Sequence, residues 1–426
     1  MTTPGPELQA MQAAVEELAR GEGLDFPEIV YEVVDHAQLN EIAALGGFPV
    51  RYPHWRFGME YDRLIKGHTY GLQRIYELVV NTRPVVAYLL SQNSMTEQKL
   101  VMAHVCGHAD FFAHNAWFSH TDPGMMDILA SHGTRIRTLC DAHGLEEVEG
   151  FIDRVQSLDN LVDHGALGRA RGLPGNAPPL DRGASERDLL GLLLVRGHLT
   201  DWQVEVLSML RDEAYYFLPQ MLTKIMNEGW ASFWHSRLMT SQLLRDAEVV
   251  DYADQHSGAM GGEGTMNPYK LGIELFRRIY ADHGGGQAGL AAVFDARAVH
   301  NDLTFCDNFL DERFCREWRL GKDRDECLAA REGLLAQLTN GGQPVIRWLG
   351  VEGDELELEH CWNGVELQME AAEDTLRNLA ALWDGTVRLH TRLDDRALLL
   401  SCGGEEVSRE YGELLGGEEQ GPGEAA

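Results

Sequence analysis

The sequence predicts a mainly α-helical protein with a small α+β unit near its C-terminal end. From residue 7 to about residue 338, apolar side chains recur every three to four positions, which is the period of a helix packed on a core. Beyond the glycine-rich turn at 339–342 the pattern changes to short runs with alternating polar and apolar residues, as in strands. Hydrophobic residues make up 44% of the 426-residue chain, which excludes disorder over most of its length.

Charge and cysteine usage exclude several classes of protein. The 36 basic residues against 67 acidic ones give a net charge of −31, so nucleic acid and anionic lipid would be repelled. No apolar run approaches the length of a membrane span, and residues 1–20 lack the pattern of a secretory signal. The seven cysteines include no CxxC pair, so we expect a reducing compartment, no disulfide framework and a cytoplasmic location.

The helical part is predicted element by element. We expect an ordered aromatic loop at 48–62, because Tyr52, Trp55 and Phe57 are costly to expose to water. Thr96 is a plausible N-cap for a long helix, and Pro219 is expected to separate two helices. The expected helices cover residues 7–20, 35–44, 96–118, 125–143, 147–161, 200–218, 220–243 and 268–280.

The C-terminal part has the pattern of a ββαββ unit. Strands are expected at 345–349, 355–361, 386–393 and 396–402, with a helix at 371–383. The acidic, glycine-rich residues that follow are expected to be disordered. The predicted domains are therefore a helical core domain at 1–338, an α+β domain at 343–403 and an acidic disordered tail at 404–426.

His104 and His108 are the first candidate metal ligands. Residues four apart on a helix lie about 40° apart around its axis, so two imidazoles at this spacing can bind one metal ion. Asn115 extends the same helix face and is a candidate to hydrogen-bond a metal ligand and hold it in place. Two ordinary helix histidines remain the alternative.

Glu228 is the third candidate ligand. It lies among Trp230, Phe233 and Trp234, where a buried carboxylate needs a cationic partner such as a metal ion. A structural ion pair with Arg237 or Arg211 is the alternative. Asn227 and Ser232 are expected to hydrogen-bond the metal ligands and hold them in place. His235 is read as a proton-transfer residue, a substrate-binding residue or a core histidine.

Two histidines on one helix and a glutamate on a later helix resemble the zinc ligands of the gluzincin metallopeptidases, whose motifs are HExxH and, downstream, NEG-F-A. The run Asn227-Glu228-Gly229-Trp230-Ala231 is similar to the second motif. Val105, however, stands where gluzincins carry the general-base glutamate. The resemblance therefore implies a divalent ion, Zn²⁺ first, and leaves the base to Glu213, Glu60 or His235.

Four further residues are assigned to the neighbourhood of this site. Tyr269 could supply an oxyanion donor, although Asn267 and Pro268 also suit an ordinary helix start. His54 and Trp55 could line a substrate pocket or plug the core. Trp230, beside Glu228, is assigned with them to substrate binding.

Longer stretches of the chain resemble the stage V sporulation protein R (SpoVR) family of bacteria. The similar stretches lie at 53–58, 75–78, 103–112 with Asn115, 220–235, 267–272 and 300–305, and the resemblance spans about residues 10–400. Cys106 and His114 depart from the family pattern. The resemblance implies a link to sporulation or stress physiology. It also implies a PrkA-type serine kinase and a von Willebrand-like protein as possible partners.

Three functional hypotheses follow. The first is a metal-dependent hydrolase that acts on an amide in a cell-wall peptide or a protein. The second is a non-catalytic regulator that works with the kinase, which Val105 favours. The third is a transferase on the same metal-binding scaffold. Whether the chain is an enzyme stays open at this level.

Overall fold

The fold is mainly helical, as expected, with a five-stranded mixed sheet and one helix near the C-terminal end. The structure is a computed structural model that describes residues 2–52, 54–69, 77–170, 185–253, 268–318, 320–321 and 323–414. Two compact units are formed: Met1–Asp141, Leu167–Leu180 and Tyr216–Leu338 make the first, and Ala142–Ala166, Asp181–Tyr215 and Thr339–Ala426 the second. Among the described residues, no helix has the length and apolarity to cross a bilayer.

The first unit contains a three-stranded sheet that the helical reading of residues 7–338 did not include. Strand β3 (Val85–Leu90) lies between β1 (Ile29–Val34), which runs parallel to it, and β2 (Glu77–Val80), which runs antiparallel. Most of β3 is buried. Its continuous apolar sequence is typical of a central strand, and such a run has no period that distinguishes it from a buried helix.

Helices make up the rest of the first unit. They include α1 (Pro6–Gly21), α2 (His36–Ala44), α3 (Trp55–Thr69), α4 (Met95–His114), α5 (Met125–His143), α10 (Lys224–Leu238), α12 (Pro268–Asp282), α13 (Gly286–Val299), α14 (Asp302–Phe309), α15 (Glu312–Glu317) and α16 (Arg324–Leu338). Short helical turns cover Ala116–Phe118, Met239–Leu243 and Asp246–Glu248.

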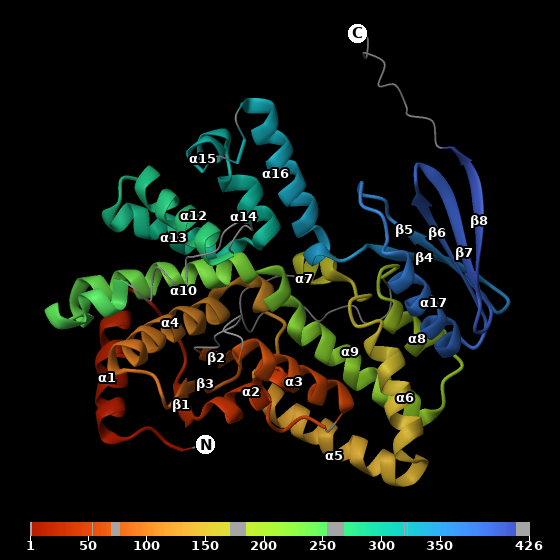
Figure 1. Cartoon of the computed structure of the whole chain (residues 1–426), viewed down its shortest axis with the longest axis horizontal. Coiled ribbons are helices and arrows are strands. Elements are labelled where there is room, and N and C mark those ends of the chain that lie inside the picture. Colours follow the sequence, from red (N-terminus) through yellow and green to blue (C-terminus); the bar gives the residue numbers. More distant parts are fainter. Residues whose placement is uncertain are drawn as a thin grey trace. The chain divides into compact units, whose positions relative to one another are not determined.

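Helix α10 lies between α4 and α12, with the small sheet on the other side of α4 (Figure 1), and α13 contacts both α12 and α4. Glycine makes this close packing possible. A Cβ atom on Gly107 of α4 would lie 2.7 Å from the Cα of Ala231 on α10. A Cβ on Gly272 of α12 would lie 2.2 Å from the carbonyl oxygen of Ile225 and 2.7 Å from the Cα of Gly229. Backbone therefore touches backbone on both sides of α10, closer than ordinary side chains allow.

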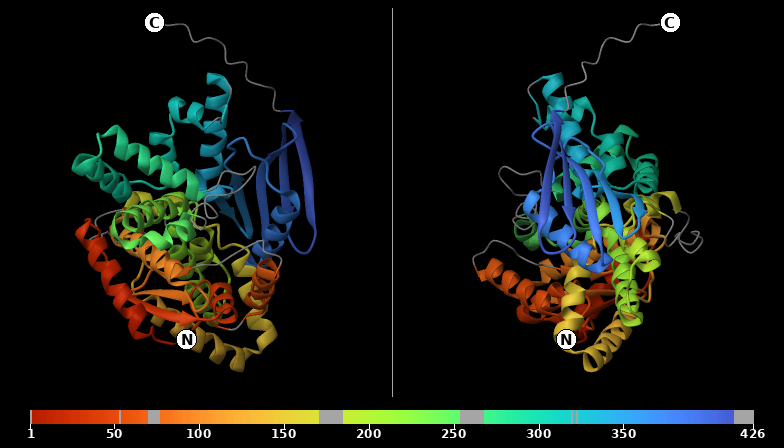
Figure 2. Two further views of the ribbon diagram at one scale, coloured as in Figure 1. Left: turned by 60° about the vertical axis from the view of Figure 1, so that its left-hand side comes forward. Right: turned by 90° about the vertical axis from the view of Figure 1, so that its right-hand side faces the viewer.

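The second unit is built on the sheet β4-β5-β6-β7-β8, in which only the β5–β6 pair is parallel. Helix α17 (Met369–Trp383) covers one face of this sheet (Figure 2) and also contacts α6 (Leu145–Gln156). The strands are β4 (Ile346–Glu352), β5 (Glu355–His360), β6 (Thr386–Leu393), β7 (Arg396–Cys402) and β8 (Val407–Leu414). Helix α8 (Leu189–Arg196) belongs to this unit, while α7 (His164–Ala170) and α9 (Asp201–Leu222) each contribute residues to both units.

Several sequence predictions need correction. Residues 407–414, expected in a disordered tail, form the edge strand β8, so the unit has the order ββαβββ. Their charged side chains lie at exposed positions of an edge strand. Such a strand has the same charged composition as a disordered segment, so composition alone does not distinguish the two. Residues 415–426 lie outside the described residues. Residues 142–166 and 181–215, expected in the helical domain, belong by their contacts to the second unit.

Three local predictions in the first unit are also wrong. The aromatic loop expected at 48–62 becomes helix α3 from Trp55, and Trp55 itself is 50% exposed. The N-cap of α4 is Ser94 and not Thr96, because Ser94 and Glu97 form a reciprocal capping box. Pro219 lies inside α9 and does not begin the next helix, which starts at Lys224.

Replacement of Gly272 by alanine tests the packing of α12 on α10. The added Cβ would meet the carbonyl oxygen of Ile225, so we expect the free energy of unfolding to fall by about 1–3 kcal/mol. The control is Gly333→Ala in α16, where an added Cβ meets no atom within 4 Å. Better helix propensity should make this control more stable by about 0.5–1 kcal/mol. Denaturant titrations that rank the two variants the other way would contradict the packing argument.

Candidate metal centre

His104, His108 and Glu228 converge on one point, as the sequence predicted. The Oε2 atom of Glu228 lies 3.5 Å from Nε2 of His104 and 3.6 Å from Nε2 of His108. All three atoms lie within 4.8 Å of one another. Tetrahedral zinc with bonds of about 2.0–2.1 Å holds its ligand atoms about 3.3–3.4 Å apart. The observed separations therefore suit a single ion.

The local structure explains why the three side chains meet. His104 and His108 are one turn apart on α4, and their ring centroids are 4.5 Å apart. Gly107 lies between them in sequence and lets the backbone of α10 approach at Ala231. Because Glu228 is three residues before Ala231 on α10, its carboxylate reaches the histidine pair.

Both imidazoles are oriented through their second nitrogen. Nδ1 of His108 lies 2.9 Å from Oδ1 of Asn227, and Nδ1 of His104 lies 2.8 Å from Nδ1 of His235. An amide oxygen only accepts, so His108 carries its proton on Nδ1 and leaves the Nε2 lone pair facing Glu228. His104 in the same tautomer would donate from Nδ1 to Nδ1 of His235, which accepts when its own proton is on Nε2. Such partners are typical of metal-bound histidines.

The electrostatics favour a bound cation. In the metal-free protein, burial raises the pKa of the Glu228 carboxyl, but the facing His108 and His104 side chains, when protonated, outweigh burial and lower this pKa below its ordinary value. A divalent ion between the three side chains would stabilise the carboxylate in the same direction, with both imidazoles neutral. The two cations considered as alternative partners bind other acids: Arg237 pairs with Glu22 and Arg211 with Asp188. An ionised Glu228 and two neutral imidazoles make a set with one negative charge.

The three side chains of the centre are largely buried. Those of His104 and His108 are 4% and 6% exposed and that of Glu228 is 19% exposed, and the facing atoms Nε2 of His104 and Oε2 of Glu228 are buried. Three protein ligands would leave a fourth position of a tetrahedral ion for water or substrate, which is the pattern of catalytic zinc sites.

Val105 is fully buried in the hydrophobic core. It supplies no acid at the position where gluzincins carry their general base. Glu60 pairs with Arg63, which lowers its pKa and weakens it as a base. Glu213 is buried on the part of α9 that belongs to the second unit. His235 contacts the far nitrogen of His104, a place suited to orienting that ligand.

Two residues expected at the site have structural roles instead. Trp230 is fully buried, and its indole N–H donates to Asp110 at 2.9 Å, so substrate cannot reach it where it lies. Asn115 caps the end of α4 and donates to the carbonyl oxygens of Arg297 and His300. Sequence reasoning placed both near the metal because they lie on or just beyond the ligand helices.

The remaining predicted residues stay predictions. Ser232 is buried one turn after Glu228, and no hydrogen bond of its hydroxyl is found among the described residues. His54 is buried against Tyr52, while Trp55 is half exposed. Tyr269 lies in the first turn of α12, and its side chain lies outside the described residues.

Asp302 is a positioning residue that sequence reasoning missed. Its two carboxylate oxygens accept the backbone N–H groups of Ile225 and Met226 at 2.8 and 2.9 Å. Thr223 does not cap α10 with its side chain, so this cap from α14 satisfies the start of the helix that carries Glu228. The pair Asn301-Asp302 suggested a cap, and Asn301 does cap α14; only the fold shows that Asp302 caps α10.

Comparisons with known proteins identify the family of the chain. The family described as SpoVR like protein matches residues 4–172 and 180–328. The chain belongs to the SpoVR-like family. An uncharacterised protein of Escherichia coli K12, YcgB, is 29% identical over 380 residues, with 73% of each chain covered. No solved structure matches the chain. Membership in the SpoVR-like family was predicted from the sequence and is confirmed.

Ligand variants of this SpoVR-like protein test the metal centre. Purified wild type is expected to bind about one Zn²⁺ per chain, and His104→Ala and Glu228→Gln should lose it, because two ligands hold zinc weakly. Asn227→Ala should bind about 10–100-fold more weakly through loss of the orienting hydrogen bond. His198→Ala, at an exposed position, is the control. Elemental analysis and zinc titration give the result, and equal occupancy in all variants would refute the centre.

The cap by Asp302 predicts a pH dependence of stability. Burial raises the pKa of its carboxyl to about 7, against the opposing effect of the N–H groups of Ile225 and Met226. The unfolded chain has an aspartate pKa of about 3.9. Folded protein therefore binds the proton more tightly, and this stabilisation, complete below pH 4, is lost as the pH rises through 7.

The measurement compares wild type with Asp302→Asn. The difference in unfolding free energy, wild type minus variant, should decrease between pH 5 and pH 8. A difference that stays constant or grows over this range would show that the carboxyl is already ionised in the folded protein at pH 5.

Proposed function

We propose that this SpoVR-like protein is a metal-dependent hydrolase whose ion is held by His104, His108 and Glu228. The observation that carries the proposal is the convergence of these three ligand atoms within 4.8 Å of one another. The orienting contacts of Asn227 and His235 support it, because a site built to hold imidazoles in one tautomer suits metal binding. Zinc is the proposed ion, since two imidazoles and one carboxylate are a common zinc set.

The proposed substrate is an amide in a cell-wall peptide or a protein. The support comes from the SpoVR family, whose resemblance to this chain implies a link to sporulation or stress physiology. The charge of the chain adds an argument, because a net charge of −31 disfavours phosphate-rich substrates and tolerates neutral or cationic peptides. A role in sporulation or stress physiology is part of the same proposal.

The chain's own residues would hold the site ready for this chemistry. Glu228 would bind the ion and supply the one negative charge of the ligand set. Asn227 and His235 would keep the two imidazoles in the tautomer that binds a metal. A divalent ion bound there would supply Lewis acidity and lower the pKa of a bound water to about 7. Because Val105 replaces the usual carboxylate base, water ionisation would depend on the site's charge more than in the gluzincins.

A second candidate function is favoured by Val105 alone. An apolar, fully buried residue at the base position suits a scaffold that binds metal without catalysis. Such a protein would act as a regulatory partner of a PrkA-type serine kinase and a von Willebrand-like protein. The metal would then stabilise the packing of α4 on α10.

A turnover assay separates the two functions. Zinc-loaded wild type is incubated with peptide and muropeptide libraries, and new amines are detected by mass spectrometry. The hydrolase predicts products that disappear with a chelator or with Glu228→Gln, and that His198→Ala still forms. His235→Ala should lower kcat, because its partner His104 loses its fixed orientation. A fully zinc-occupied wild type that cleaves no library member would contradict the hydrolase and favour the regulator.

A further inference from the structure

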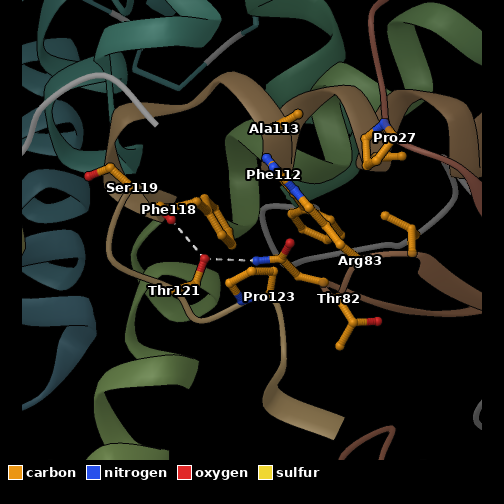
Figure 3. A pocket seen from close by; sticks show the side chains of 12 residues that line it. Pro27, Thr82, Arg83, Phe112, Ala113, Phe118, Ser119, Thr121 and Pro123 are labelled. Carbon is orange, nitrogen blue, oxygen red and sulfur yellow. Dashed lines mark hydrogen bonds between the residues drawn. The ribbon is translucent and has the colours of Figure 1, made fainter. Parts of the chain in front are cut away.

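A cavity of about 220 Å³ lies in the first unit, beside the C-terminal half of α4 (Figure 3). Four segments line it: the chain before β1, the β2–β3 loop with the start of β3, the last turns of α4 and the chain that follows α4. Its volume equals about seven water molecules in the liquid, so it can hold one small organic group. The lining residues are Pro27, Asn81, Thr82, Arg83, Val85, Ala109, Phe112, Ala113, Phe118, Ser119, Thr121 and Pro123.

The walls of this cavity are mainly apolar and aromatic. The rings of Phe112 and Phe118 pack with their centroids 5.1 Å apart, and both line the space together with prolines and alanines. In Figure 3 these two rings and the side chain of Arg83 gather around the same opening. Aromatic walls with a few polar groups are typical of small-molecule sites.

Most of the polar groups at the cavity already form hydrogen bonds within the protein. The amide of Asn81 donates to the hydroxyl of Thr121, which donates to the carbonyl oxygen of Phe118. The hydroxyl of Thr82 donates to the carbonyl oxygen of Pro84. These bonds stabilise the loops that form the cavity.

Two side chains at the cavity that can donate hydrogen bonds have no acceptor among the residues that the structure describes. Arg83 is an exposed residue at the cavity, and its guanidinium makes no ion pair or hydrogen bond within the part of the chain that the structure describes, although acidic residues outnumber basic ones 67 to 36. The Ser119 hydroxyl is buried, and none of the described residues is its hydrogen-bond partner. A cation without an acceptor, next to aromatic walls, matches a ligand that carries an anion on an apolar body.

We propose that the cavity binds a small carboxylate with one apolar group, such as an arylacetic acid. The carboxylate would accept from Arg83, and the apolar group would pack against Phe112 and Phe118. A carboxylate fits better than a phosphate, because one cation and largely apolar walls do not compensate a doubly charged group.

The cavity shares a wall with the metal centre. The ring of Phe112 lines the cavity and stacks on the ring of His108, with centroids 6.0 Å apart and planes at 16°. A ligand against Phe112 would thus be separated from a metal ligand by a single ring. Binding in the cavity needs no metal, so the inference goes beyond the proposed function and stands without it.

Calorimetric titration of the full chain with phenylacetate tests the inference, and phenylacetamide is the neutral control ligand. Wild type should bind phenylacetate, and the amide should bind about tenfold more weakly or worse, because it lacks the charge-assisted hydrogen bonds. Arg83→Gln should lose about tenfold for phenylacetate and little for the amide. The matched control is Arg63→Gln, whose arginine is exposed and pairs with Glu60, and it should bind as wild type does.

Two further variants make the result unambiguous. Ala113→Leu places a larger side chain in the cavity and should abolish binding of both ligands while thermal unfolding shows a folded protein. His104→Ala should retain phenylacetate binding, which separates this site from the metal centre. No binding to wild type at millimolar phenylacetate, equal binding of acid and amide, or an unchanged affinity in Arg83→Gln would each overturn the proposal.

Discussion

The candidate metal centre depends on the contact between the backbones of α4 and α10. Gly107 permits it, because its missing side chain leaves room for Ala231. The distance between the two helices decides whether the Glu228 carboxylate meets the imidazoles of His104 and His108 at ligand distance or stops short of them. A metal bound by these ligands would in turn hold the helices together, so packing and binding stabilise each other.

Buried polar residues keep α10 in its place along and around its axis. Asp302 binds its first N–H groups from α14, and Asp110 of α4 accepts from the indole of Trp230. Asp110 also pairs with Arg297 of α13. Each of these acids has its partners within the core, which is the condition for burying a charge. The anchors lie on α4, α13 and α14, and together they orient Glu228 toward the histidine pair.

The candidate metal centre and the cavity share α4. His104 and His108 lie on the metal side, while Ala109 and Phe112, one to four residues after His108, line the cavity. The stacked rings of Phe112 and His108 join the two. A helix that presents ligands in one direction and a binding wall in another explains why so much of α4 is buried even though it carries several polar side chains.

The sequence by itself determined the helical class, the spacing of His104 and His108 on one helix, the family, and the choice of Glu228 as the third candidate ligand. These depend on periodicity and on motifs a few residues long, which local structure reproduces. Only the tertiary structure decided that Trp230 belongs to the core and that Asp302 caps a helix almost 80 residues earlier. Both are contacts between segments far apart in the chain, and no local pattern encodes the distance or direction between such segments.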